Sequence, residues 1–504
     1  MKILLVLPSD EHSISSDIMK NVQRGVGFLP PLGLFSLAAW IIEHTGWEAE
    51  VRDCCLEGVS AADGAAAAAD GGFDAVGLCC LSHGWPEVWR WAEALKKLEK
   101  PPLVIAGGPH ASLFPAELLS HRCIDYAVLG EGEEPLQQLL ELWGGLSSEE
   151  RRKVLDRNRA LWLKSAEGAA GTAGYDSPLP SAERIPAVMR FGDSLKTPYV
   201  FANLNVLPFA RRDLGRYSEY LTVVSRKSCT TTITASRGCP YACRFCWTAG
   251  GKHPRQFSPE HVCAEMEQSV NLGIEEFFFF DELFTYSRDW VEAFCRLLIK
   301  RGLPVSWDVR SRADTVSADM LKLMHSAGCH RVQYGFEAGT ARVLKALGKG
   351  ITLEQSRSAA SWTQAAGMAS YADFMLGAPD ETLEEMEETI AFAKDLHLDY
   401  AHFAVIMLYP RTRFYKEALA DGFLADDVWQ AYAAAPEPDD DFQIPYASRL
   451  FSREVLEAKA AEAYRRICFT PEYIWRRIKG LSSWNELKMG AAAAWGLLVG
   501  NRGR

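Results

Sequence analysis

The chain has 504 residues, of which 48% are hydrophobic and 24% are charged. This balance predicts a globular protein of about three domains and excludes global disorder. Lys and Arg total 54 against 65 Asp and Glu, a net charge of −11. Such an acidic chain argues against a nucleic-acid partner, because phosphate binding needs clustered basic charge.

The sequence shows no sign of membrane insertion or export. No apolar run reaches the roughly 18 residues that a membrane-spanning helix needs. The opening MKILLVLPSDEH has an apolar run too short for a signal-peptide core, and it favours a first strand. The 13 cysteines are an odd number in a chain without an export signal, which argues against a disulfide framework and predicts a cytoplasmic protein.

Residues 1–145 alternate strand-like and helix-like patterns. Strands are predicted at 2–8, 49–55, 75–82, 103–109 and 126–133, with helices at 32–46 and 85–100. Strands separated by helices predict a parallel sheet with right-handed crossovers, and ligands bind such sheets beyond the carboxyl ends of the strands. The residues expected at these ends are Pro8, Ser82, Gly107, Gly108, Gly130 and Gly132.

The remainder of the chain divides into three parts. Residues 146–228 are less regular, and the small polar stretch 165–178 predicts a loop in this linker region. Residues 229–425 predict a partial (β/α)6 barrel, in which chemistry sits at the carboxyl ends of the strands. Residues 426–504 predict a helical C-terminal region, with a helix at 452–467 opened by Ser452 and a packed helix in the tail 491–500. The barrel strands are expected at 230–238, 275–285, 304–314, 331–339, 370–382 and 400–410.

The stretch SRGCPYACRFCW at 236–247 places three cysteines, Cys239, Cys243 and Cys246, in one loop. Iron–sulphur cubanes are normally held by four Cys thiolates, so three ligands would leave one iron open to a bound ligand. A zinc site completed by His253 and a set of structural cysteines are the alternatives.

The run CPYACRFC resembles the cluster loop of radical S-adenosylmethionine (SAM) enzymes. The resemblance continues through FFFFDELFT, YGFEAGT, LGKGIT and FMLGAPDET, over about residues 229–415. PPLGLFSLAAWI, GGPHA and VLGEGEE resemble the cobalamin-binding domain that precedes the radical domain in one branch of that superfamily. The chain is therefore similar to cobalamin-dependent radical SAM methyltransferases, with a Rossmann-like cobalamin-binding domain over residues 1–145.

This resemblance implies that the three loop cysteines hold a 4Fe–4S cluster whose open iron is chelated by SAM. Reductive cleavage would give methionine and a 5′-deoxyadenosyl radical. Asp281 or Glu282 is expected to bind the methionine ammonium, and Glu337 and Asp373 match pocket positions expected to bind the ribose. For each acid the alternative is a strand-end cap or a surface charge.

The methionine carboxylate needs a cation, for which Lys349 or Arg312 is expected, and Phe245 is expected to pack on the adenine. Cobalamin is expected along the strand ends of the N-terminal domain that carry Ser82, Gly107, Gly108, Gly130 and Gly132. His12 is interpreted as a polar loop residue and not as a cobalt ligand, because Ser15 replaces the glycine of the DxHxxG signature. No catalytic side chain is assigned.

The architecture implies methylation of an unactivated carbon in a small-molecule or natural-product substrate, with two SAM molecules used per turnover. The alternatives are radical ring formation, ring contraction or oxidation without methyl transfer, and a non-catalytic cobalamin or redox sensor. An external one-electron donor such as flavodoxin or ferredoxin is the expected partner.

Overall fold

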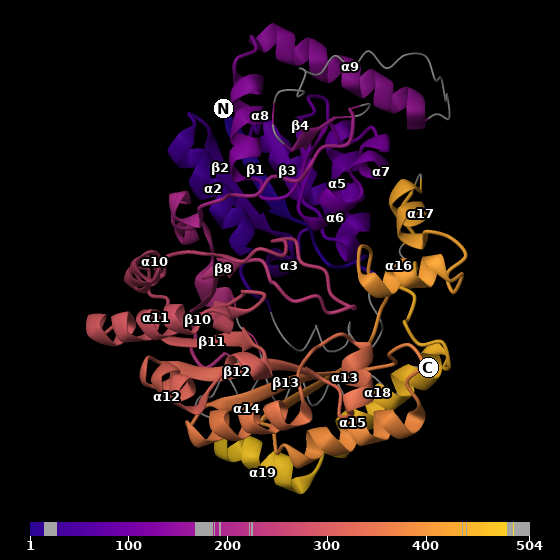
Figure 1. Ribbon diagram of the computed structural model, residues 1–504. Helices are drawn as coiled ribbons and strands as arrows, with labels where there is room; N and C mark the ends of the chain where they lie inside the picture. The colour runs from indigo at the N-terminus through magenta and orange to yellow at the C-terminus, as the bar shows by residue number, and fades with distance from the viewer. Residues whose placement is uncertain are drawn as a thin grey trace. The chain divides into compact units, whose positions relative to one another are not determined.

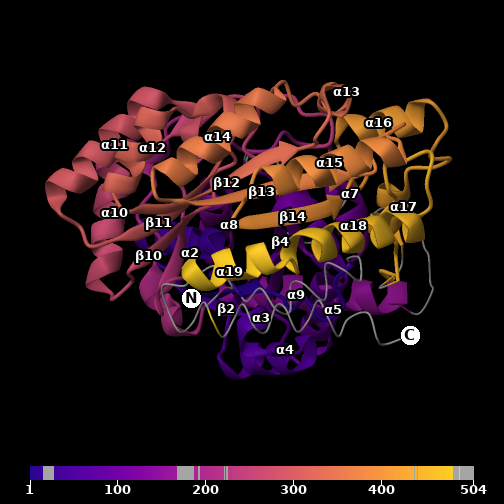
Figure 2. The same ribbon diagram turned by 90° about the horizontal axis from the view of Figure 1, so that it is seen from below.

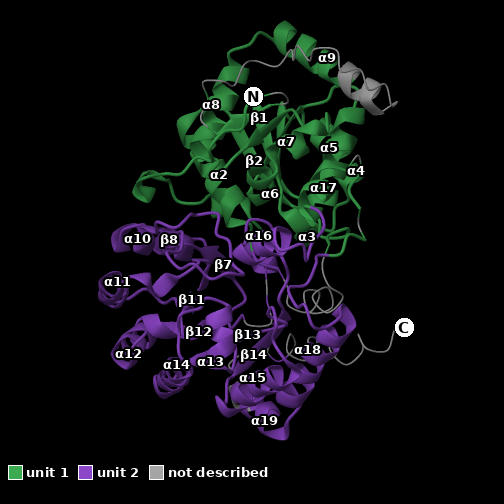
Figure 3. Ribbon diagram, turned by 45° about the vertical axis from the view of Figure 1, so that its right-hand side comes forward, with its two compact units in different colours: residues 1–15, 30–216, 427–443 green, residues 16–29, 217–426, 444–504 purple. Residues whose placement is uncertain are grey.

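The computed structural model, drawn in Figures 1 and 2, describes residues 1–14, 28–166, 185, 187–190, 193–220, 222, 225–435, 437–439, 441–480 and 487. The chain forms two compact units (Figure 3). Unit 1 comprises residues 1–15, 30–216 and 427–443, and unit 2 comprises residues 16–29, 217–426 and 444–504. Most of the predicted loop at 165–178 and all of the predicted tail helix at 491–500 lie outside the described residues.

Unit 1 is built on a six-stranded sheet with the order β2-β1-β3-β4-β5-β6. The five predicted strands are present and parallel, and a short sixth strand pairs antiparallel with β5. That sixth strand has only two residues and therefore no sequence periodicity to reveal it. The strands are β1 (Lys2–Leu7), β2 (Glu48–Asp53), β3 (Ala75–Cys79), β4 (Leu103–Gly107), β5 (Tyr126–Val128) and β6 (Val188–Met189).

Helices surround this sheet, and both predicted helices are present as α2 and α5. A buried ion pair anchors α5, because Lys96 Nζ lies 2.7 Å from Asp125, which also accepts from the backbone N–H of Val104 at the start of β4. The helices are α2 (Leu32–His44), α3 (Cys54–Glu57), α4 (Ala61–Asp70), α5 (Trp85–Lys97), α6 (Pro109–Leu113), α7 (Pro115–Ser120), α8 (Glu133–Gly144), α9 (Ser148–Ala166) and α17 (Val428–Ala434), with 3-10 turns η1 (Ser82–Gly84), η2 (Leu204–Val206) and η3 (Arg212–Leu214).

Unit 2 is built on a six-stranded parallel sheet with the order β14-β13-β12-β11-β10-β7, which confirms the predicted partial barrel. The predicted strand at 230–238 is divided into β7 and β8, because the chain leaves the sheet after Ile233 to form a separate antiparallel pair with β9. The strands are β7 (Thr230–Ile233), β8 (Ser236–Arg237), β9 (Arg255–Gln256), β10 (Glu276–Phe279), β11 (Ser306–Ser311), β12 (Cys329–Glu337), β13 (Ala369–Leu376) and β14 (Tyr400–Val405).

The helices α11, α12, α14 and α15 lie along one side of this sheet (Figure 2). Capping boxes open α14 at Thr352 and α15 at Thr382, so the sequence marks both helix starts. The helices are α10 (Pro259–Asn271), α11 (Arg288–Arg301), α12 (Ala318–Ser326), α13 (Ala341–Ala346), α14 (Leu353–Ala365), α15 (Leu383–Asp395), α16 (Arg413–Ala420), α18 (Arg453–Cys468) and α19 (Pro471–Gly480), with 3-10 turns η4 (Tyr217–Glu219), η5 (Phe284–Tyr286) and η6 (Ala313–Thr315).

Helix α18 lies against β14, the strand at one end of the sheet. The hydroxyl of Tyr464 on α18 accepts a hydrogen bond of 3.2 Å from the backbone N–H of Phe403 on β14. The predicted helix and its N-cap position, Ser452, are both found, although the Ser452 side chain makes no capping hydrogen bond. No helix in the described part of the chain is long and apolar enough to cross a membrane.

Candidate functional site: a three-cysteine loop and its surroundings

The three-cysteine loop begins where β8 ends. Gly238 has a φ of 102°, and a Cβ at this position would lie 2.8 Å from the carbonyl oxygen of Gly250, so glycine is required here. The backbone N–H of Cys239 donates to Gly251 O over 3.0 Å, which closes the loop on itself. Farther along, the N–H of Arg244 donates to Leu347 O over 2.9 Å. The loop is therefore closed at its ends and bonded near its middle to another segment of unit 2.

All three loop thiols are free, as are the ten other cysteines. The backbone N–H of Cys246 donates to Cys243 O over 3.2 Å, which brings the second and third cysteines into one turn. Among the described residues, no three His, Cys, Asp or Glu side chains are arranged to hold a single metal ion.

Asp281 and Glu282 hold the loop from the end of β10. Asp281 is fully buried and accepts hydrogen bonds from Ala235 N at 2.8 Å and from the Ser236 hydroxyl at 2.5 Å. Burial raises the pKa of Asp281 to about 7. Glu282 accepts from Gly238 N at 3.1 Å and, with its other oxygen, from the Thr248 hydroxyl at 2.6 Å. Both acids therefore bind the chain that carries the cysteines.

Glu337 ends β12 with a φ of 68°, a left-handed conformation that is uncommon for a side-chain-bearing residue. Its Oε1 accepts from Lys349 Nζ at 2.7 Å, whereas its buried Oε2 has no hydrogen-bond partner. Glu337 and Lys349 are only 4% and 7% exposed. Burial raises the pKa of Glu337, and the Lys349 ammonium opposes that rise. This buried carboxylate oxygen can accept a further hydrogen bond.

Arg312, just after β11, lies between the cysteine loop and the loop that carries Lys349. Its guanidinium binds Asp314 through two nitrogens, at 2.9 and 3.0 Å, and donates to Lys349 O at 2.7 Å. Nη1 lies 3.8 Å from the Sγ of Cys243, and the guanidinium carbon lies 3.5 Å from the ring centroid of Tyr241. Arg312 thus connects two loops at the carboxyl edge of the sheet.

Asp373 on β13 lies opposite His402 on β14 in the strand register. Its Oδ1 is 3.0 Å from His402 Nδ1, and its Oδ2 accepts from Gln333 Nε2 at 2.8 Å. The negative charge of Asp373 also raises the pKa of Glu337, after the larger effect of burial. The predicted ribose acids are therefore electrostatic neighbours.

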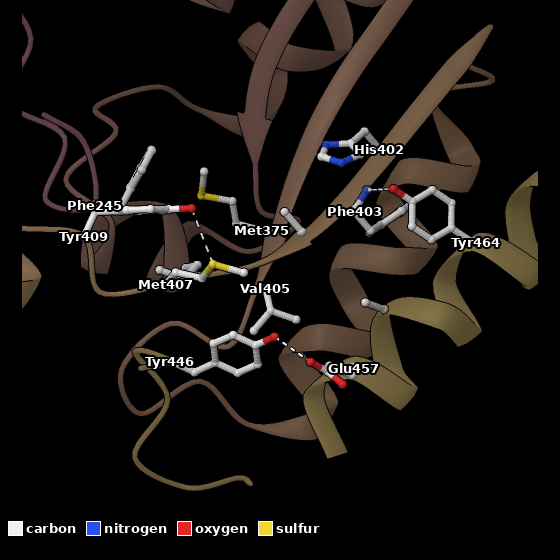
Figure 4. Close-up of a pocket in the computed structure, with 13 residues that line it drawn as sticks. Phe245, Met375, His402, Phe403, Val405, Met407, Tyr409, Tyr446, Glu457 and Tyr464 are labelled. Atoms are coloured by element: carbon white, nitrogen blue, oxygen red, sulfur yellow. Dashed lines mark hydrogen bonds between the residues drawn. The ribbon is translucent and has the colours of Figure 1, made fainter. Parts of the chain in front are cut away.

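Phe245 and His402 line a mainly apolar cavity of about 170 Å³, which Figure 4 shows. Its wall combines two thioethers with several aromatic rings, and its polar groups include a Tyr446 hydroxyl that donates to Glu457 over 2.8 Å. The lining residues are Phe245, Met375, His402, Phe403, Ala404, Val405, Ile406, Met407, Tyr409, Tyr446, Glu457, Ala460 and Tyr464.

His402, Tyr241 and Asp314 also belong to this region, although they were not predicted from the sequence. His402 follows β13 by more than twenty residues, and only the strand pairing brings it to Asp373. Tyr241 lies inside the CPYACRFC run and Asp314 lies two residues after Arg312, so closeness in sequence to these predicted groups was the available signal.

In unit 1, the glycine-rich strand ends make close contacts with the chain itself. Gly108 has a φ of 95°, and a Cβ there would lie 3.0 Å from Cys80 O; a Cβ at Gly130 would lie 2.3 Å from Tyr199 O. Glycine at these two positions therefore has a structural reason, independent of any ligand.

The other residues predicted at the carboxyl ends of the unit 1 strands also have partners or neighbours within unit 1. The Ser82 hydroxyl is 3.1 Å from Nδ1 of the buried His110. Gly107 is open, with only Val128 O within 4 Å of an added Cβ, and Gly132 would meet Leu37 at 3.3 Å. His12 is paired through Nδ1 with the buried carboxylate of Glu87.

Two family models match the chain: the B12 binding domain over residues 21–140 and the Radical SAM superfamily over residues 233–393. The chain is 32% identical over 446 residues to the uncharacterized methyltransferase PH0819 of Pyrococcus horikoshii, with 86% of each chain covered. It is 27% identical over 354 residues to an anaerobic magnesium-protoporphyrin IX monomethyl ester cyclase of Rubrivivax gelatinosus, covering 68% of this chain and 58% of that protein. Its fold is similar to that of the radical SAM methyltransferase TsrM from Kitasatospora setae, with a TM-score of 0.60 and 19% identity over 83% of this chain and 75% of TsrM.

These matches define a radical SAM enzyme with an N-terminal cobalamin-binding domain. The chain belongs to the family of cobalamin-dependent radical SAM methyltransferases that includes PH0819. The predicted fold class, enzyme class and cofactors, which are a 4Fe–4S cluster, SAM and cobalamin, are therefore confirmed, and the non-catalytic sensor loses its support.

Proposed function

We propose that this enzyme methylates an unactivated carbon of a small-molecule substrate. The methyl transfer is supported by the 32% identity to the methyltransferase PH0819. The SAM site is supported by the unpartnered carboxylate oxygen of Glu337, which is buried beside Lys349 near the three-cysteine loop. It fits a ribose hydroxyl, which is a hydrogen-bond donor, and so it supports a SAM site at this edge of the sheet. When bound, the cluster supplies the electron that cleaves SAM, and cobalamin carries the methyl group to the substrate.

Cys239, Cys243 and Cys246 are proposed as the cluster ligands. Their loop has the spacing that leaves one iron without a protein ligand. The loop is held in place by Asp281 and Glu282 through the hydrogen bonds at its two ends. Such support fixes the ligand positions before the cluster binds, as second-shell groups do in metal sites.

The remaining pocket groups are assigned to parts of SAM by their charge. Glu337 and Asp373 are proposed to accept hydrogen bonds from the ribose. Glu282, which is exposed, suits the methionine ammonium better than the fully buried Asp281.

Two further contacts complete the proposed SAM site. Lys349 donates one of its three hydrogens to Glu337 and retains two for the methionine carboxylate. We favour Lys349 over Arg312 in this role, because the Arg312 guanidinium is already bonded to three protein groups. Phe245 is proposed to pack on the adenine from the wall of the apolar cavity (Figure 4).

Cobalamin is proposed to bind along the carboxyl ends of the unit 1 strands. Parallel α/β sheets bind ligands at this edge. Gly107 supports the proposal most directly, because an added Cβ there would meet only Val128 O, at 3.9 Å. The proposed contact residues are Ser82, Gly107, Gly108, Gly130 and Gly132.

The apolar lining of the cavity supports a substrate that presents hydrocarbon to the radical. Apolar walls exclude water from the reacting groups. Radical ring formation is the second candidate function, and it is supported by the 27% identity to a protein named as a cyclase.

We propose an external one-electron donor, such as flavodoxin or ferredoxin, because the cluster needs one electron for each radical cleavage. A cytoplasmic location is also proposed. The 13 free cysteines support it, since thiols stay reduced in that compartment.

Product analysis tests the reaction type. Reconstituted enzyme is incubated anaerobically with methyl-labelled SAM, cobalamin, a reductant and a metabolite extract. We expect S-adenosylhomocysteine and 5′-deoxyadenosine in near-equal amounts, with the label in a product, because one SAM donates methyl and another gives the radical. Steady release of 5′-deoxyadenosine without S-adenosylhomocysteine would favour ring formation or oxidation instead.

A further inference from the structure

Arg312 is placed where it touches a sulphur atom of the cysteine loop. Its Nη1 is 3.8 Å from Cys243 Sγ, within the range of an N–H···S hydrogen bond. The side chain is 5% exposed, so water does not screen its charge effectively. A buried cation therefore lies directly beside one of the three proposed cluster ligands.

The guanidinium is held rigidly in this position. Asp314 binds it through two parallel hydrogen bonds, and the backbone carbonyl of Lys349 accepts a third at 2.7 Å. The ring of Tyr241, two residues after Cys239, lies 3.5 Å from the guanidinium carbon. Because planar contacts of this kind restrain the whole group, Nη1 points at Cys243 without freedom to turn away.

Two ordinary roles do not account for the contact with sulphur. If Arg312 served only to connect two loops, its hydrogen bonds to Asp314 and to the Lys349 carbonyl would be sufficient. A binding site for the SAM carboxylate would leave the guanidinium edge unoccupied, whereas here both of its terminal nitrogens already have partners.

We infer that Arg312 is a positioning residue that raises the reduction potential of the cluster through its hydrogen bond to Cys243. Reduction adds one electron to the cluster, and a fixed positive charge at a ligand sulphur stabilises that added negative charge. The electron comes from the external donor, and no bond is made or broken in the protein. This inference rests on the proposed assignment of Cys243 as a cluster ligand.

The test is a redox titration of the full-length, anaerobically reconstituted protein, followed by electron paramagnetic resonance of the reduced cluster. Arg312→Gln is expected to shift the one-electron equilibrium about tenfold toward the oxidised form, which equals a potential about 59 mV more negative. Arg312→Lys, which retains the charge without the planar donor, is expected to shift it by a smaller amount in the same direction.

Arg310→Gln is the matched control. Arg310 lies on β11 two residues before Arg312, is exposed, and contacts the ring of Phe280 at 4.3 Å. The substitution removes the same charge from a neighbouring position without removing a bond to a cysteine. We expect its cluster to keep the wild-type potential.

The outcomes separate this inference from the ligand assignment. A wild-type potential in Arg312→Gln, or equal shifts in Arg312→Gln and Arg310→Gln, would overturn the inference while leaving Cys243 as a ligand. If Arg312→Gln binds no cluster, the potential of the Arg312→Lys cluster is measured instead. An unshifted potential in Arg312→Lys would then overturn the inference about Arg312. If Cys243→Ala retains a full cluster with the wild-type potential, the ligand assignment itself fails.

Discussion

Replacing Cys243 by alanine is expected to reduce the iron of the anaerobically reconstituted protein from about four atoms per chain to background. The loop offers three thiolates, and a cubane held by two protein ligands has two irons exposed to solvent. The brown chromophore and the reductive cleavage of SAM should disappear together, because the cleavage electron passes through the cluster. Iron and sulphide analysis, the visible spectrum and 5′-deoxyadenosine release measure these effects.

Cys229→Ala provides the matched control for this variant. Cys229 is a free, half-buried thiol that comes directly before β7, whereas the cysteine loop follows that strand. It should retain wild-type iron content and SAM cleavage. A Cys243→Ala protein with a full-strength cluster would refute the assignment, and wild-type protein that retains zinc without iron would favour the zinc alternative.

Glu337→Gln is expected to weaken SAM binding by roughly tenfold to a hundredfold, because a hydrogen bond to a charged group contributes about 1.5–3 kcal/mol. The amide keeps the size of the side chain and can still accept from Lys349, but it loses the negative charge proposed to bind the ribose. Equilibrium binding of SAM to the reconstituted protein measures the loss. The iron content should remain at the wild-type value.

Asp308→Asn is the control for the loss of a buried negative charge. Asp308 on β11 pairs with Arg331 on β12 and is 8% exposed, but it has no proposed contact with a cofactor. This variant should lower the free energy of unfolding without changing the affinity for SAM. Wild-type SAM affinity in Glu337→Gln would contradict the role proposed for Glu337.

The strands and the cysteine loop could be predicted because their signals are local. Strand β10 contains three consecutive phenylalanines, and the cysteine spacing of the loop is contained in eight residues. The strand ends were predicted too long, since turns begin inside the apolar runs. At 230–238, the chain leaves the sheet to let Asp281 bind Ala235 and Ser236, a contact made across more than forty residues.

The contacts between residues of the site could not be predicted from local sequence patterns. The sequence contains both Asp373 and His402, but only the register between β13 and β14 places them opposite each other. The sequence alone does not say why the glycines of unit 1 are needed. Glycine is required where a ligand needs space and also where another backbone segment approaches closely, and at Gly130 that segment is the backbone of Tyr199.

Helix α18 covers part of the sheet edge and also forms part of the cavity wall. Its Tyr464 covers a backbone N–H on the end strand β14, where an uncovered edge would invite pairing with another chain. The same helix contributes Glu457, Ala460 and Tyr464 to the cavity wall. Substitution of Tyr464 would therefore change the cavity wall and uncover the edge of the sheet at the same time.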